Sequence, residues 1–167
     1  MGLSGKLQFR QEIKSPGNAF PEIFYGSKKE ILPKICPERL PVLEILDGNW
    51  GEVGCTIVVH YQMANGETVI STEKIVASDA KNMSITYDLV GDLMKHYKSF
   101  KVTLHMESQG QKTFLVITYE YEKQSPDVLG PDGIGMVDFA SELISIVDAY
   151  VLNNITSFPS QTSNTIT

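Results

Sequence analysis

Regular alternation of apolar and polar side chains is the feature that most constrains how this chain can fold. In residues 7–13 the odd positions carry one set of side chains, largely apolar, and the even positions carry charged or polar ones. Neighbouring side chains of a β-strand point to opposite faces, so such a segment buries one face only. The same period recurs in residues 55–63, 83–89, 100–106 and 115–121, and residues 40–46 and 69–77 add two less regular strands. Short turns separate these segments, which predicts an antiparallel meander of about seven strands.

Helical spacing is expected at three places. A short helix follows Ser15-Pro16, and a second spans residues 28–35 before Pro37. A long helix is predicted over residues 131–152, because apolar side chains recur there every three or four positions. Its predicted apolar stripe is Met136, Phe139, Ala140, Leu143, Ile146, Val147 and Tyr150, with Asp138, Glu142 and Asp148 directed away from it.

Length and composition favour a single domain. At 167 residues the chain is long enough for one hydrophobic core, and it shows no internal repeat or linker. We expect this domain to span residues 1–153. Residues 154–167 are polar and aperiodic, which predicts a disordered tail.

Charge and composition also exclude several classes of partner. The net charge is −6 and the pI is about 5.0, whereas nucleic acids and anionic membranes attract a basic face. No apolar run approaches the roughly 20 residues of a membrane span, and the N-terminus has no apolar signal region. We therefore expect a cytoplasmic protein, either a monomer or a weak dimer. No metal or cofactor is expected, since the three histidines lack metal-ligand spacing with cysteine or carboxylate.

A loop at residues 47–54 has glycine at every third position. One interpretation is a phosphate cradle, because glycine-rich loops present backbone N–H groups to anions. The alternative is a structural turn, since the loop leads into a strand, contains no lysine and carries Asp47 and Glu52, which would repel phosphate. The sequence favours the turn.

The order of strand, two short helices, six strands and long helix resembles the birch-pollen-allergen (pathogenesis-related class ten) superfamily, and the motifs resemble its major latex protein branch. These motifs are Leu3-Ser4-Gly5-Lys6-Leu7, Leu32-Pro33-Lys34-Ile35-Cys36-Pro37, Gly48-Asn49-Trp50-Gly51-Glu52-Val53-Gly54, residues 91–100 and Tyr119-Glu120-Tyr121-Glu122-Lys123. The resemblance covers residues 3 to about 153. It implies an α+β helix-grip fold, in which a curved seven-stranded antiparallel sheet and two short helices surround the long C-terminal helix and enclose a hydrophobic cavity. The residue pattern alone fits an ordinary packed core equally well.

Polar side chains at inward positions are the informative candidates within such a cavity, because a buried hydroxyl or carboxylate needs a partner. Tyr61 and Tyr87 face inward by alternation, Glu73 shares the parity of Ile75 and Ala77 on one of the less regular strands, and Gln11 is a fourth candidate. The alternative is that each meets a backbone group or water. The predicted ligand-binding set is Phe9, Gln11, Cys55, Ile57, Val59, Tyr61, Glu73, Ile85, Tyr87, Leu89, Val102, Leu104, Met136, Phe139 and Leu143.

Two functions fit these residues. The first is a carrier that holds a hydrophobic or amphipathic plant metabolite, such as a steroid, flavonoid, terpenoid or hormone, with a role in plant defence or specialised metabolism. The second is a cofactor-independent cyclase or isomerase for a reactive iridoid, terpenoid or alkaloid intermediate, with Tyr61, Glu73 and Tyr87 as its catalytic candidates. Norcoclaurine synthases, which resemble this chain more distantly, use a pocket lysine. The corresponding residues 113–122 contain no lysine, so the carrier is favoured.

A glycine-rich segment precedes the predicted long helix, with Gly130, Gly133 and Gly135 close together. Glycine disfavours helix by about 1 kcal/mol per residue, so this segment is expected to open more readily than the rest. The resemblance implies that it lies at the rim of the cavity. We therefore expect residues 130–135 to move when a ligand enters; the alternative is a tight turn with no such role.

Overall fold

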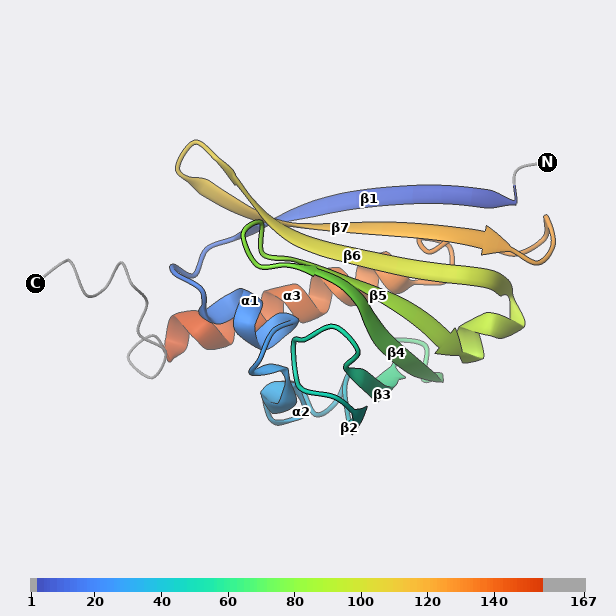
Figure 1. Ribbon diagram of the computed structural model, residues 1–167, viewed down its shortest axis with the longest axis horizontal. Coiled ribbons are helices and arrows are strands. Elements are labelled where there is room, and N and C mark those ends of the chain that lie inside the picture. The colour runs from blue at the N-terminus through green and yellow to red at the C-terminus, as the bar shows by residue number, and fades with distance from the viewer. Residues whose placement is uncertain (1–2, 155–167) are drawn as a thin grey trace, which may run out of the picture.

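The computed structural model describes residues 3–154, which form one curved antiparallel sheet of seven strands wrapped over a long helix (Figure 1). The strands β2 to β7 follow one another as a meander, and β1 pairs with β7 to complete the order β1-β7-β6-β5-β4-β3-β2. This confirms the predicted fold class. The strands are β1 (Ser4–Ile13), β2 (Val42–Asp47), β3 (Thr56–Gln62), β4 (Thr68–Asp79), β5 (Ser84–Gly91), β6 (Tyr97–Gln109) and β7 (Lys112–Lys123).

The helices lie on the concave side of the sheet (Figure 1). Three short ones connect the two edge strands β1 and β2: α1 (Ala19–Phe24), the 3-10 helix η1 (Lys29–Ile31) and α2 (Leu32–Ile35). A second 3-10 helix, η2 (Asp92–Lys95), joins β5 to β6, and the long helix α3 (Met136–Asn153) ends the described chain. Both α1 and α2 contact α3, so this end of the molecule is filled by helix–helix packing.

The long helix begins five residues later than the sequence predicts. Gly135 has a left-handed backbone with φ of 85°, and α3 starts at the next residue. Before it, residues 130–136 form hydrogen-bonded turns, in which the Ile134 N–H donates to the Gly130 oxygen at 3.1 Å and the Met136 N–H to the Pro131 oxygen at 3.0 Å. The predicted start at Pro131 is therefore wrong, because a positive φ interrupts helical geometry.

The buried face of α3 also differs from the predicted stripe. Ile144 and Val151 are fully buried, and Asp148, predicted to point away, is buried as well. The Asp148 carboxylate accepts hydrogen bonds from the backbone N–H groups of Lys14 at 2.8 Å and Ser15 at 2.9 Å. The prediction for Asp148 is wrong because a carboxylate that satisfies two backbone donors can be buried.

Two details of the sheet bear on the site. In β4 the register with β5 shifts between Ile75 and Ala77, so Ala77 is exposed whereas Glu73 and Ile75 point inward. The glycine-rich loop that leads into β3 folds as a structural turn. Its Gly54 N–H donates to the Ile75 oxygen at 2.9 Å and the Cys55 N–H to the Glu52 oxygen at 3.0 Å, so these donors are already used within the chain.

Candidate functional site

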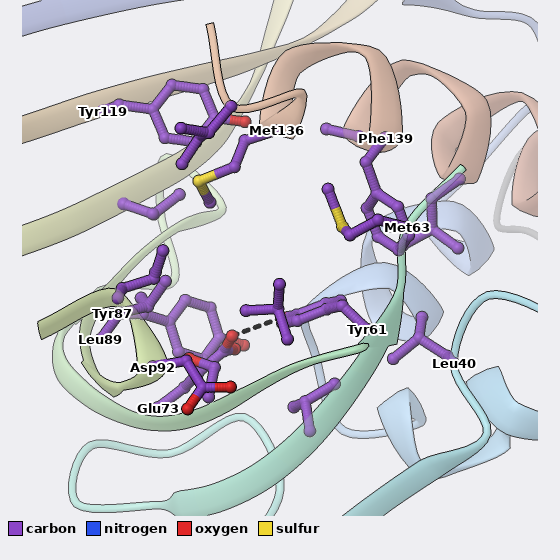
Figure 2. Close-up of a pocket in the computed structure, with 18 of the residues that line it drawn as sticks. Leu40, Tyr61, Met63, Glu73, Tyr87, Leu89, Asp92, Tyr119, Met136 and Phe139 are labelled. Atoms are coloured by element: carbon purple, nitrogen blue, oxygen red, sulfur yellow. Dashed lines mark hydrogen bonds between the residues drawn. The ribbon is translucent and has the colours of Figure 1, made fainter. Parts of the chain in front are cut away.

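A cavity of about 420 Å³ lies between the concave face of the sheet and the N-terminal half of α3. Such a volume lies within the range of small-molecule sites in proteins. Strands β3 to β7 provide its floor, η1 and α2 close one end, and the first two turns of α3 cover it (Figure 2). Its apolar wall includes Phe24, Leu32, Leu40, Val59, Leu89, Leu93, Val102, Leu104, Ile117, Met136, Phe139, Ala140 and Leu143.

One end of the cavity reaches the protein surface. Its lining there comes from the β3–β4 turn, from η2 with the residue that follows it, and from the segment before α3. Glu67, Thr68, Lys95 and His96 are exposed, and Ile134 is partly exposed. At this rim the cavity meets the solvent.

Tyr61 and Glu73 form a hydrogen-bonded pair inside the cavity (Figure 2). Glu73 lies on β4 and is 4% exposed, and its carboxylate accepts a hydrogen bond from the hydroxyl of Tyr61 on β3. Burial, followed by the negative charge of Glu73, raises the pKa of Tyr61 well above its ordinary value, so Tyr61 stays protonated at neutral pH. The Tyr61 and Phe139 rings form a T-shaped pair with 5.3 Å between centroids, which ties the hydrogen-bonded pair to α3.

A second polar group in the cavity is built around a buried lysine. Lys29 of η1 is 8% exposed, and its Nζ donates to the Tyr87 hydroxyl at 3.2 Å and lies 4.5 Å from the centre of that ring. The Tyr87 hydroxyl in turn donates to the backbone oxygen of Tyr25 at 3.4 Å.

The protonation of this second group follows from its surroundings. Burial lowers the pKa of Lys29, but the interactions with Tyr87 and Glu73 outweigh that effect and leave the pKa raised. Burial raises the pKa of Tyr87, and the Lys29 charge partly opposes this. At neutral pH the cavity therefore holds a lysine ammonium and neutral tyrosines.

Most of the predicted ligand-binding residues reach this cavity. Their strand parity sets the face on which they lie, and the helical spacing of α3 places three more on its sheet-facing side. The predicted residues that line the cavity are Val59, Tyr61, Glu73, Tyr87, Leu89, Val102, Leu104, Met136, Phe139 and Leu143.

Five predicted residues lie outside the cavity lining: Phe9, Gln11, Cys55, Ile57 and Ile85. Phe9 stacks on Tyr119 with 6.4 Å between ring centroids, and the Gln11 amide donates to Ser145 Oγ at 3.0 Å on α3. The other three are at most 5% exposed within the packed core. Alternation gives the face of a strand but not the position along it, and β1 packs directly on α3 where the cavity has ended.

Sequence reasoning missed Lys29, Tyr25 and Tyr119, all of which line the cavity. The sequence analysis did not single out Lys29, because lysine is rarely buried. A signal was nonetheless present: Lys29 lies three residues before Leu32 and seven before Cys36, which places it on the same helical face as those two buried residues.

Among residues 3–154, no three histidine, cysteine or acidic side chains lie close enough to hold a metal ion. A search of the same residues for a helix long and apolar enough to cross a membrane finds none.

A curved sheet that grips a C-terminal helix around an apolar cavity defines the class as a helix-grip protein. Within that class, residues 3–154 match the model of the pathogenesis-related protein Bet v 1 family, and the chain belongs to this family. The fold of the family is one that binds hydrophobic ligands.

Individual relatives place the chain in the major latex protein branch. It is 31% identical over 154 residues to MLP-like protein 31 of Arabidopsis thaliana, across 90% of this chain and 88% of that protein. The crystal structure of ginseng major latex-like protein 151 from Panax ginseng superposes with a TM-score of 0.82 at 29% identity, covering 89% of this chain and 98% of that one. Norcoclaurine synthase from Thalictrum flavum, at 15% identity, a TM-score of 0.71 and coverage of 89% and 87%, shares the fold.

Proposed function

We propose that this protein is an intracellular carrier that binds a hydrophobic or amphipathic plant metabolite in the cavity beneath α3. The observation that carries the proposal is a cavity of about 420 Å³ whose wall is mostly apolar and whose polar groups gather at Tyr61–Glu73 and Lys29–Tyr87. Transfer of apolar ligand surface from water supplies about 25 cal/mol per Å² before the costs of association. The polar groups would orient the ligand, as the few polar groups of such sites usually do.

Titration with N-phenyl-1-naphthylamine, a neutral apolar dye, tests this proposal. We expect saturable binding with an increase in fluorescence, and displacement by members of a panel of steroids, flavonoids and terpenoids. Leu104→Trp and Leu143→Trp should each abolish dye binding, because the indole would occupy the cavity. Val90→Trp is the matched control, since Val90 follows the cavity residue Leu89 on β5 but is 45% exposed. No saturable binding by the wild type, or equal binding by all four proteins, would refute the carrier.

A second function is supported by the same polar groups. A carboxylate, a lysine ammonium and two neutral phenols surround one cavity, and these are groups that can move a proton or polarise a carbonyl. The cavity could also hold a flexible intermediate in a reactive conformer, which lowers the barrier by orientation. We propose as the alternative a cofactor-independent cyclase or isomerase of plant specialised metabolism, with Tyr61, Glu73 and Tyr87 as its catalytic groups.

The two functions differ in what happens to the bound molecule. A reactive dialdehyde or iminium intermediate that also reacts spontaneously should be mixed with catalytic amounts of protein. An enzyme changes the product or stereochemical ratio, and Glu73→Gln and Tyr61→Phe restore the spontaneous ratio. A carrier at catalytic amounts leaves the ratio unchanged.

A further inference from the structure

Lys29 has hydrogen-bonding capacity that the described chain does not use. An ammonium group carries three N–H donors. Among residues 3–154, Tyr87 Oη is the one hydrogen-bond acceptor that Lys29 Nζ has, at 3.2 Å. Because Lys29 is 8% exposed and belongs to the cavity wall, a molecule that fills the cavity is the available source of acceptors for its remaining donors. A buried donor without a partner costs free energy that a ligand acceptor would recover.

Tyr87 holds this ammonium in place. The tyrosine lies on β5 between Ile75 of β4 and Val102 of β6, and is 4% exposed. Its hydroxyl accepts a hydrogen bond from Lys29 Nζ at 3.2 Å and donates one to the Tyr25 backbone oxygen at 3.4 Å. The hydroxyl therefore serves Lys29 as an acceptor, and Tyr87 acts as a positioning residue.

Charge balance limits the acceptor that a ligand can bring. Glu73 lies in the same cavity and attracts Lys29 through its negative charge. A neutral acceptor leaves one positive and one negative group in balance. A carboxylate ligand would instead place a second negative charge near Glu73 in a medium of low dielectric constant, which is unfavourable.

We propose that Lys29, positioned by Tyr87, donates a hydrogen bond to a carbonyl oxygen of the ligand, so that the cavity selects neutral ketones and aldehydes with an apolar body. This rests on the proposed function, since it names the ligand class for the same cavity. The raised pKa of Lys29 supports the role, because a charged ammonium is a donor and not a nucleophile that would form an imine.

The test compares two neutral dyes of similar size. N-phenyl-1-naphthylamine has no carbonyl group and reports the cavity alone. 6-Propionyl-2-(dimethylamino)naphthalene carries a ketone whose emission moves to longer wavelength when its oxygen accepts a hydrogen bond. For Lys29→Met we expect the affinity for the ketone dye to fall about tenfold more than the affinity for the first dye, with ketone emission at shorter wavelength; a tenfold loss is the size expected when a charged donor is removed. Lys29→Arg, which keeps a charged donor, should retain most of the ketone affinity.

Lys74→Met is the matched control, because Lys74 is the exposed neighbour of Glu73 on the outer face of β4. If Lys29→Met does not fold, the double variant Lys29→Met with Glu73→Gln removes both charges and allows the same comparison of the two dyes. Tyr87→Phe is a further test, for which we expect a smaller loss of ketone affinity. A ketone affinity and emission in Lys29→Met equal to those of Lys74→Met would overturn the inference while leaving the carrier intact. Tighter competition by decanoate than by 2-undecanone would overturn the choice of a neutral ligand. Absence of binding by the first dye would refute the carrier itself.

Discussion

The two halves of α3 carry similar apolar side chains but have opposite roles. In the C-terminal half, Ile144, Val147 and Val151 are fully buried in the hydrophobic core. In the N-terminal half, Met136, Phe139 and Leu143 face the cavity of about 420 Å³. The same helical stripe therefore forms a solid core at one end and the roof of a binding site at the other.

The difference arises from what lies opposite each half. Helices α1 and α2 contact α3 and fill the space at the packed end, where Asp148 also binds the backbone after β1. Opposite the N-terminal half, strands β3 to β7 and η2 line the cavity, and η1 and α2 contribute only residues at one end of it. A helix stripe thus specifies a face, and the neighbouring elements decide whether that face encloses a cavity. Substitutions in the C-terminal half of α3 should therefore affect mainly stability, and substitutions in the N-terminal half mainly ligand binding.

The largest expected effect comes from truncating adjacent residues on either side of this boundary. Ile144 is fully buried, whereas its neighbour Leu143 is 6% exposed and borders the cavity. We expect Ile144→Ala to lower the free energy of unfolding by about 4 kcal/mol and Leu143→Ala by about 2 kcal/mol, because a side chain beside an empty space has fewer atoms in contact with it. Urea unfolding measures both. Equal losses would show that the two halves of α3 are packed alike.

A smaller effect is expected from the buried carboxylate that secures the packed half. Asp148→Ala removes the acceptor of the Lys14 and Ser15 N–H groups and should destabilise the fold by about 2 kcal/mol. Asp138→Ala, an exposed change in the first turn of the cavity half, is the control and should cost less than about 1 kcal/mol. Dye affinity should be unchanged in Asp148→Ala. A loss of affinity with intact folding would mean that the two halves are coupled.

The sequence predicted the features of the fold that depend on local pattern, but not those that depend on distant contacts. Period-two alternation predicted the strands and the inward face of Glu73, because the side-chain direction of a strand is a local property. The start of α3 was not predictable from apolar spacing, since it depends on the positive φ of Gly135. Asp148 was predicted to point outward and Lys29 was not identified, because their burial depends on partners distant in sequence, Ser15 and Tyr87. Hydrophobic pattern specifies faces, whereas buried charges are explained only by the contacts that compensate them.

The Tyr97 hydroxyl is expected to make an intermediate contribution to stability, and this contribution depends on pH. The hydroxyl donates to the Leu129 oxygen and so anchors the segment that leads to α3. Burial, with the nearby Tyr121 and Asp132, raises the pKa of Tyr97 to about 12. Because the folded value exceeds the unfolded value of about 10, this contribution to stability is complete below pH 10 and is lost as the pH rises through 12.

The measurement is urea unfolding of the wild type and Tyr97→Phe between pH 9 and 11. The wild type should lose roughly 1.3 kcal/mol more than the variant over this range, since only the wild type contains the titrating group. Parallel stability curves for the two proteins would show that Tyr97 ionises alike in the folded and unfolded states.

The smallest expected effect concerns residues 130–135, which follow Leu129, the acceptor of the Tyr97 hydroxyl, and precede α3. The turns of residues 130–135 are held by a few hydrogen bonds. The Ile134 N–H donates to the Gly130 oxygen, and the Gly135 N–H donates to the Asp132 oxygen at 3.2 Å. Ile134 borders the cavity rim. If the segment opens to admit a ligand, these amides should exchange with deuterium faster than those of the packed half of α3. With the apolar dye at five times its dissociation constant, exchange should slow about sixfold, or about 1 kcal/mol, because a closed complex must first release its ligand. The amides of Val147 and Val151 provide the internal reference and should be unaffected at short exposure times. Exchange at residues 130–135 that is the same with and without the dye would leave the glycines as a tight turn with no role in ligand entry.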